Sequence, residues 1–290
     1  MSGGKGRRCR RCGETTGAGN CPDVVDDGHP VQCVGEWAVG DKHHYLQRYI
    51  EASRGARAKF VGQAGAAFID LFAGPGRARN RDDGTVHATS SVIALEHQAS
   101  PFTKVVSCDL APENVAALRD RTRQHGSRVH VEQGDCNEVI EALLAQVPSE
   151  GLNFAFVDPF RIGALRFDTL RALAAFRRMD MLINFPTLDV RRNFAQYASP
   201  GCTFVDDAVG TSRWRTGTTT TSHVARIHEV LVQELEALGY TGTVNRTLPI
   251  KRRGAEMYRL VFVAKNELAD KIWASIIKNP PSGQRELPLA

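Results

Sequence analysis

An apolar run over residues 66–71 that leads directly into a glycine turn constrains the fold more than any other feature of the chain. A run of this kind is typical of a strand covered on both faces of a parallel sheet. Gly74 and Gly76 allow the backbone to bend sharply and approach a ligand, and Asp70 stands where the strand ends. Open α/β sheets bind ligands at the carboxyl ends of their strands. The stretch therefore predicts a ligand site, the alternative being a turn that binds nothing.

Four further apolar runs have the length of strands and are followed by a polar residue. They cover residues 104–108, 129–132, 152–157 and 179–183, and helical patterns lie between them. Strands that alternate with helices predict an α/β fold with a mostly parallel sheet and helices on both faces. Two last strands, at 241–248 and 257–264, flank a basic turn and predict a terminal antiparallel hairpin.

Length and composition are those of one large α/β domain with appendages. The chain has 290 residues, of which 42% are hydrophobic, and its net charge is +5. That charge permits a polyanionic partner without indicating one. No apolar run is long enough to cross a membrane, and the basic, glycine-rich start lacks the apolar segment of a secretory signal. We expect a cytoplasmic protein with no membrane partner.

Four of the seven cysteines lie near the start of the chain, at Cys9, Cys12, Cys21 and Cys33. Thiolates suit tetrahedral zinc, and Cys9 and Cys12 have the spacing of one zinc knuckle. A second closely spaced pair, which would identify a zinc ribbon, is missing from the sequence. The cysteines therefore predict either a zinc site or a basic tail with incidental thiols.

Three segments outside the strands carry polar or aromatic residues. A helical pattern begins near Trp37 and is placed to cover the predicted ligand site. Its Lys42 and His43 either face that site or, as we expect, lie on a solvated helix face. Residues 77–88 predict a long polar loop, either a lid that faces the substrate or a surface loop. Residues 193–222 predict an irregular insertion, in which Trp214 either stacks on a substrate base or packs as an ordinary side chain.

The glycine turn resembles that of S-adenosylmethionine (SAM) methyltransferases. The shared pattern is D-x-F-x-G-x-G, formed by Asp70, Phe72, Gly74 and Gly76. The resemblance implies a Rossmann-like class I methyltransferase sheet. It also implies that the turn supports the methionine part of SAM and that Asp70 orients its ammonium group.

The ends of the next two strands fit the same resemblance. A carboxylate that ends the second strand, here Asp109, accepts hydrogen bonds from ribose hydroxyls. Asp135 and Cys136 follow the third strand, where such an enzyme contacts the adenine. Capping of the following helix is the alternative role for both aspartates, and packing is the alternative for the thiol.

The fourth strand ends in Asp158-Pro159-Phe160, which resembles the catalytic D/N-P-P-Y/F element of amino methyltransferases, with one proline in place of two. The resemblance implies that Asp158 orients an acceptor amine and that the aromatic ring stacks on a base. Asn184 and Phe185 end the fifth strand and are predicted to line the substrate pocket. A plain turn is the alternative at both strand ends.

Together these motifs resemble the three-Cys-motif partner (TcmP) family. The shared motifs are Trp37-x4-Lys42-His43-x2-Leu46-x2-Tyr49, the turn 70–76, Gly134-Asp135-x-Asn137, Asp158-Pro159-Phe160, Asn184-Phe185-Pro186 and Tyr258-Arg259-Leu260-Val261-Phe262. The resemblance covers about residues 30 to 278. It implies a SAM-binding fold and a separate three-Cys-motif protein as a partner.

We therefore expect a cysteine-rich segment at 1–34, a methyltransferase-like domain at 35–280 with an insertion near 190–222, and a tail at 281–290. The expected function is SAM-dependent methylation of an amino nitrogen in a nucleic acid or nucleotide-like substrate. The alternatives are a small-molecule biosynthetic methyltransferase and a non-catalytic nucleic-acid-binding adaptor that keeps a SAM-like pocket.

Overall fold

The computed structural model describes residues 25–216, 222–240, 247–252 and 254–279. It also describes the backbone of three short strands, which are β1 (Arg7–Arg8), β2 (Thr15–Thr16) and β3 (Asn20–Cys21). Most of the predicted cysteine-rich segment and the predicted tail 281–290 lie outside the described residues.

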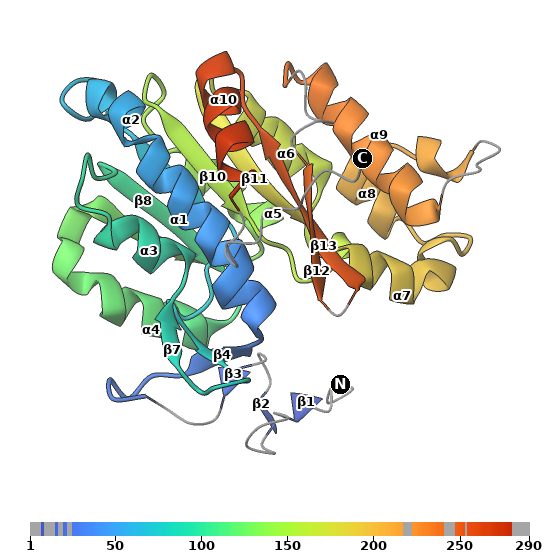
Figure 1. Cartoon of the computed structure of the whole chain (residues 1–290), viewed down its shortest axis with the longest axis horizontal. Coiled ribbons are helices and arrows are strands. Elements are labelled where there is room, and N and C mark those ends of the chain that lie inside the picture. Colours follow the sequence, from blue (N-terminus) through green and yellow to red (C-terminus); the bar gives the residue numbers. More distant parts are fainter. Residues whose placement is uncertain are drawn as a thin grey trace.

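A seven-stranded sheet forms the centre of the molecule (Figure 1). Its order is β12 (Thr247–Arg252), β13 (Ala255–Val263), β11 (Met179–Phe185), β10 (Asn153–Val157), β5 (Ala67–Asp70), β8 (Lys104–Asp109) and β9 (Val129–Gln133). The strands from β11 to β9 are parallel, and β13 is antiparallel to both of its neighbours. This confirms the Rossmann-like methyltransferase fold class.

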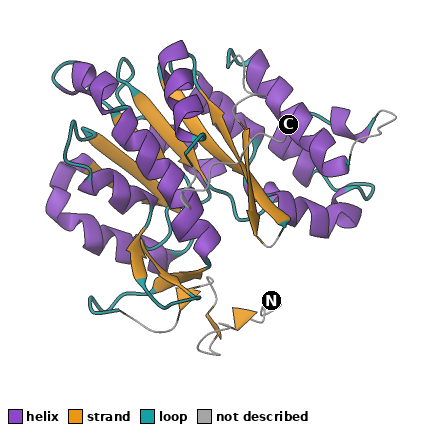
Figure 2. Ribbon diagram, in the orientation of Figure 1, coloured by secondary structure: helices purple, strands orange, loops and turns teal. Residues whose placement is uncertain are grey.

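Helices cover both faces of this sheet (Figure 2). One face packs against α1 (His43–Ala52), α3 (Ser90–Glu96) and α10 (Glu267–Ile276), and the other against α5 (Cys136–Leu144), α6 (Phe167–Ala174) and α9 (His223–Ala237). Two more helices are α2 (Arg54–Val61) and α4 (Pro112–Thr122). Along β10, Phe154 and Phe156 face the first layer while Ala155 and Val157 face the second. Each fully buried Phe contributes about 1.5–3 kcal/mol, so this alternation fixes the register.

A hairpin replaces the long loop predicted at 77–88, so that prediction is wrong. Strands β6 (Arg77–Asn80) and β7 (Val86–Ala88) are antiparallel, and β6 pairs in parallel with β4 (Val31–Val34). With β3 they form a four-stranded sheet, which lies beside α4 and the start of α1 in Figure 1. Gly84 explains the hairpin, because its φ of +85° suits the tight turn after Asp83.

Much of the segment predicted to be irregular is helical. It contains the end of α7 (Thr187–Tyr197), all of α8 (Phe204–Val209) and the 3-10 turn η4 (Arg213–Arg215). Val205, Val209 and Trp214 are buried in the core between these elements and α9, which explains why short helices form here. Residues 217–221 lie outside the described residues.

The start of the first long helix also differs from expectation. Trp37–Lys42 form the π-helix η1, which continues into α1. Lys42 and His43 are buried instead of solvated, with only 6% and 9% of their surfaces exposed. Isolated π-helical turns are uncommon and are frequent at functional sites.

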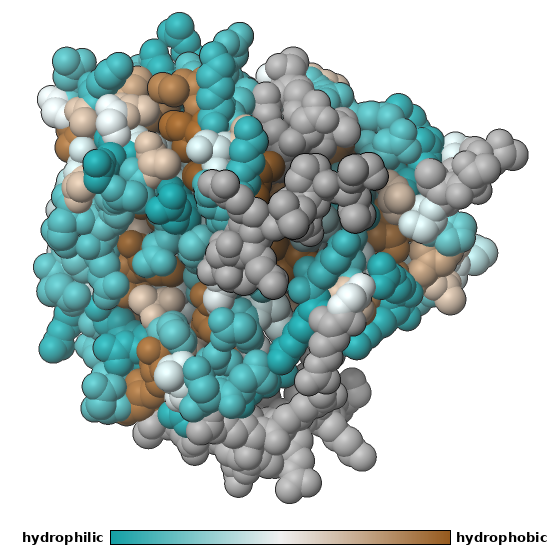
Figure 3. Space-filling view, in the orientation of Figure 1, coloured by the Kyte–Doolittle hydropathy of each residue, from teal (hydrophilic) through white to brown (hydrophobic). Residues whose placement is uncertain are grey.

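No described helix is long and apolar enough to span a membrane. The face shown in Figure 3 is mainly hydrophilic, and its hydrophobic side chains form small, scattered groups.

Candidate active site

Four carboxylates follow neighbouring parallel strands at one edge of the central sheet. Asp70 ends β5, Asp109 ends β8, Asp135 follows β9 and Asp158 follows β10. Because these four strands are adjacent and parallel, their carboxyl ends meet at the same edge. The structure therefore brings the sequence-predicted acids together at the edge where α/β sheets bind ligands.

Asp70 is fully buried beneath the glycine turn. Its Oδ2 accepts hydrogen bonds from Ser90 Oγ at 2.5 Å and Ser91 Oγ at 2.7 Å. Its Oδ1 makes no hydrogen bond, although the backbone N–H of Phe72 lies close enough to favour the ionised carboxylate. Burial raises the pKa of Asp70 to about 6, and the nearby charge of Asp158 adds to that shift. Asp70 thus offers one unused buried acceptor oxygen, which suits a donor such as an ammonium group.

The glycine turn is tied directly to Asp109. Gly74 and Gly76 have φ values of +62° and +87°, a backbone conformation that favours glycine. Gly74 N–H donates to Asp109 Oδ2 at 2.8 Å, while Ala111 N–H and Asn114 Nδ2 donate to Oδ1. A carboxylate has about four acceptor positions, so three internal bonds leave about one on Oδ2.

Asp135 caps the helix that follows β9. Its side chain accepts from Asn137 N–H at 2.9 Å, so the capping role is present, and contact with adenine stays a prediction. Asn137 also donates to Ala164 O and accepts from Thr169 Oγ1, which joins α5 to the segment after β10. Cys136 is buried, and burial raises the pKa of its thiol well above the usual range.

Asp158 is held between two side chains that come from distant parts of the chain. Its Oδ2 accepts from Lys42 Nζ at 2.5 Å, and its Oδ1 accepts from Asn184 Nδ2 at 2.7 Å. A carboxylate can only accept here, which fixes the orientation of the Asn184 amide. The amide oxygen, Asn184 Oδ1, is buried and has no hydrogen-bond partner. A bound group facing it must therefore be a donor, as an amino group is.

Two aromatic rings surround the Lys42 ammonium group. Its Nζ lies 5.7 Å from the centre of the Trp37 ring and 5.6 Å from that of Tyr258. The two rings contact each other edge to face. Lys42 thus takes the less favoured of its two predicted positions, because a Lys-His-His run is typical of a solvated helix face. Its burial depends on η1 and on Tyr258, far along the chain.

The residues after Asp158 differ sharply in exposure. Pro159 is buried, whereas 74% of Phe160 is exposed. The following turn is held by α7, since Ile162 N–H donates to Asp189 Oδ2 at 2.9 Å. Phe72, in the glycine turn, is partly buried against the core. Phe160 is thus placed at the surface beside the candidate acceptor acid.

The other two predicted substrate residues lie in the core. Phe185 is 1% exposed, and its ring packs edge to face against His228. Trp214 is 7% exposed, and its Nε1 donates to Asp206 Oδ1 at 2.6 Å. Arg215 lies over the Trp214 ring and also pairs with Asp206. These contacts are those of packed side chains, and substrate contact by either ring stays a prediction.

The zinc prediction falls mostly outside the described residues. Cys9 and Cys12 are not described, and only the backbone is described at position 21. Within the residues that are described, no group of three or more His, Cys, Asp or Glu side chains is placed to hold a metal ion. Cys33 lies on β4, and the backbone at position 21 pairs with Val31 of the same strand.

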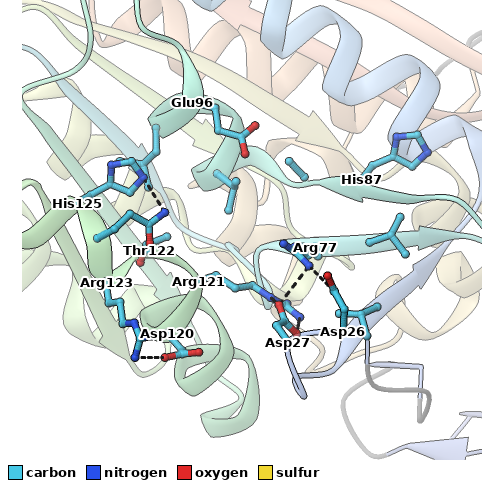
Figure 4. A pocket seen from close by; sticks show the side chains of 16 residues that line it. Asp26, Asp27, Arg77, His87, Glu96, Asp120, Arg121, Thr122, Arg123 and His125 are labelled. Carbon is cyan, nitrogen blue, oxygen red and sulfur yellow. Dashed lines mark hydrogen bonds and ion pairs between the residues drawn. The ribbon is translucent and has the colours of Figure 1, made fainter.

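A cavity of about 670 Å³ lies between α3, α4 and the β6–β7 hairpin (Figure 4). None of the residues predicted to bind the cofactor or acceptor lines it. Its charged side chains are largely paired with each other, as Arg77 and Arg121 are with Asp27. We therefore place the candidate site at the strand ends and not in this cavity.

No protein-family model and no curated protein matches the sequence. Similar solved structures include protein LPL1258 from Legionella pneumophila, with 9% identity, 83% of this chain and 94% of that chain covered, and a TM-score of 0.48. The methyltransferase domain of bacterial CtHen1 has 15% identity, coverages of 74% and 99%, and a TM-score of 0.37. Protein arginine methyltransferase 10 of Arabidopsis thaliana has 11% identity, coverages of 79% and 57%, and a TM-score of 0.28. The fold class rests on the strand order described above.

Proposed function

We propose that the protein is a SAM-dependent methyltransferase that acts on an amino nitrogen. The observation that carries this proposal is the arrangement around Asp158. The acid follows β10, whose neighbour β5 ends in Asp70, and the buried Oδ1 of Asn184 next to the acid lacks a hydrogen donor. An amino group can donate to Asp158 and Asn184 at once and thereby direct its lone pair away from both of them.

The unused hydrogen-bond acceptors near the glycine turn suit the polar groups of the cofactor. Asp70 Oδ1 suits the ammonium group of SAM, and the free position on Asp109 Oδ2 suits a ribose hydroxyl. When bound, SAM supplies the methyl group: an N–C bond forms as the C–S bond breaks, and that electron pair stays on sulfur. Asp158 orients the amine and accepts, directly or through water, the proton that the methylated nitrogen releases. Positioning of the amine against the methyl group and exclusion of water supply most of the rate acceleration.

A nucleic acid or nucleotide-like acceptor is favoured by the exposed ring of Phe160 beside Asp158. An aromatic ring at the surface suits stacking on a planar base. We also propose membership of the TcmP family, with a separate three-Cys-motif protein as partner, and zinc on the amino-terminal cysteines; these rest on the sequence motifs alone.

Two other functions make different predictions. A small-molecule methyltransferase would transfer the methyl group to a metabolite and not to a polymer. An adaptor would bind nucleic acid with an affinity that falls steeply with salt and would methylate nothing.

Incubation of the purified protein with methyl-labelled SAM and separate pools of DNA, RNA, protein and metabolites, followed by mass analysis, decides between these functions. We expect label on an amino nitrogen of the nucleic-acid or nucleotide pool. Label in metabolites alone would support the small-molecule function. Absence of label from every pool, together with no SAM binding by calorimetry, would remove the proposal.

A further inference from the structure

One continuous segment crosses both parts of the candidate site. Residues 25–42, here called the strap, run from the cysteine-rich end of the chain to Lys42. Within the strap, β4 pairs in parallel with β6, just after the glycine turn. The strap then becomes η1, which brings Lys42 onto Asp158. The same segment therefore passes the predicted cofactor turn and the predicted acceptor acid.

The guanidinium group of Arg121 fastens the strap to the turn. Arg121 Nε and Nη2 donate to the Asp27 carboxylate at 2.7 Å and 3.0 Å. Its Nη1 donates to Pro30 O at 3.0 Å and to Pro75 O, next to Gly76, at 2.6 Å. Only 4% of the Arg121 side chain is exposed. These hydrogen bonds lower the pKa of Asp27 to about 2, so the pair persists at neutral pH.

Gln32 is the strap residue that touches the turn. A Cβ added at Gly74 would lie 2.6 Å from Gln32 Nε2 and 2.9 Å from its Cδ, so only glycine allows this approach. Within the part of the chain that the structure describes, the Gln32 carboxamide makes no hydrogen bond. A half-buried amide thus faces the turn with its donor and acceptor both unused.

We propose that Gln32 is a cofactor-binding residue, carried to the site by the strap. This inference rests on the proposed function, because it assigns Gln32 to the amino-acid end of SAM at the glycine turn. A carboxamide can donate to the carboxylate of that end and accept from its ammonium group. If Gln32 instead only covers the turn, the cofactor must displace its side chain. Shortening that side chain would then tighten SAM binding.

Calorimetry with SAM and with S-adenosylhomocysteine tests the sign of this effect. We expect Gln32→Ala and Gln32→Leu to weaken binding about tenfold, as loss of a hydrogen bond to a charged group implies. Gln98→Ala, which removes an exposed amide elsewhere, serves as the matched control and should leave the affinity unchanged. Unchanged or tighter binding by both Gln32 variants would overturn the inference.

The anchor of the strap provides a second, independent test. Arg121→Gln should weaken SAM binding and increase hydrogen exchange of residues 25–42, whereas Arg123→Gln, on a guanidinium that is 80% exposed, should change neither. In the unmodified protein, SAM should slow exchange of the strap. If that protein binds no SAM, the proposed function fails. If the unmodified protein binds SAM and the Gln32 and Arg121 variants bind SAM with the same affinity, only the role of the strap fails.

Discussion

Lys42 Nζ lies 2.5 Å from Asp158 Oδ2, although 116 residues separate the two in the sequence. The strap ends at Lys42, and strand β10 leads into Asp158. Both side chains are largely buried, so neither charge is well solvated without its partner. This ion pair therefore connects the strap directly to Asp158, the residue proposed to orient the acceptor.

Asp158→Asn should separate catalysis from cofactor binding. The variant keeps the shape of the side chain but cannot take up a proton, so turnover should fall by about 10²–10⁴-fold. SAM affinity should stay nearly unchanged, because Asp70 and Asp109 are intact. Single-turnover assays and calorimetry measure the two effects. Asp168→Asn, at an 80% exposed position, is the control. Equal losses of binding and turnover would contradict the catalytic role.

Lys42→Met should destabilise the protein by about 3 kcal/mol, because it leaves Asp158 without its buried countercharge. The double variant Lys42→Met with Asp158→Asn should lose less stability than the sum of the two single changes. Urea unfolding of the four proteins gives this coupling directly. Strict additivity would show that the ion pair contributes no coupling energy to the fold.

Asp109→Ala should weaken SAM binding by about tenfold to a hundredfold, as expected for hydrogen bonds between a carboxylate and ribose hydroxyls. The same change removes the acceptor of Gly74 N–H, which also loosens the turn. Calorimetry on protein shown to be folded by circular dichroism measures the effect. Unaltered affinity would remove the assignment of the cofactor to this edge of the sheet.

SAM affinity should depend on pH through Asp70. Burial raises the pKa of this carboxyl to about 6, so protons compete with the ammonium group of SAM below that value. Affinity should rise between pH 5 and about 7 and then level off. Asp70→Asn, which cannot ionise, should bind more weakly and show no such rise. Calorimetry across this pH range in both proteins provides the comparison.

Stability should depend on pH through Asp180, which accepts a hydrogen bond from Tyr49 at 2.6 Å. Burial raises the pKa of this carboxyl to about 7, above its unfolded value of about 3.9. Between these two values the folded state binds more protons than the unfolded state, so stability falls as pH rises. Asp180→Asn should flatten that slope in urea unfolding measured from pH 4 to pH 8. If the variant's stability changes with pH as steeply as that of the unmodified protein, other groups and not Asp180 cause the pH dependence.

The central sheet was predictable because each of its parallel strands is a short apolar run that ends at a polar residue. Asp70, Asp109 and Asp158 could be placed from this pattern alone, since parallel strands share one carboxyl edge. The hairpin at 77–88 was missed, yet Asp83-Gly84 carries the sequence signal of a tight turn.

The role of Lys42 could not be predicted from its neighbours in the sequence. Its burial requires the wide turn of η1 and a ring supplied by Tyr258 from β13. Similarly, Phe185 and Trp214 have the composition of a binding surface but pack inward. Their partners, His228 and Asp206, lie on other elements that local patterns do not connect.

Among the described strands, the four-stranded sheet and the seven-stranded sheet share no ladder. Loss or replacement of the smaller sheet would leave every backbone pairing of the larger one intact. The smaller sheet, which carries Gln32 beside the glycine turn, can therefore change in sequence without breaking any backbone pairing of the larger sheet.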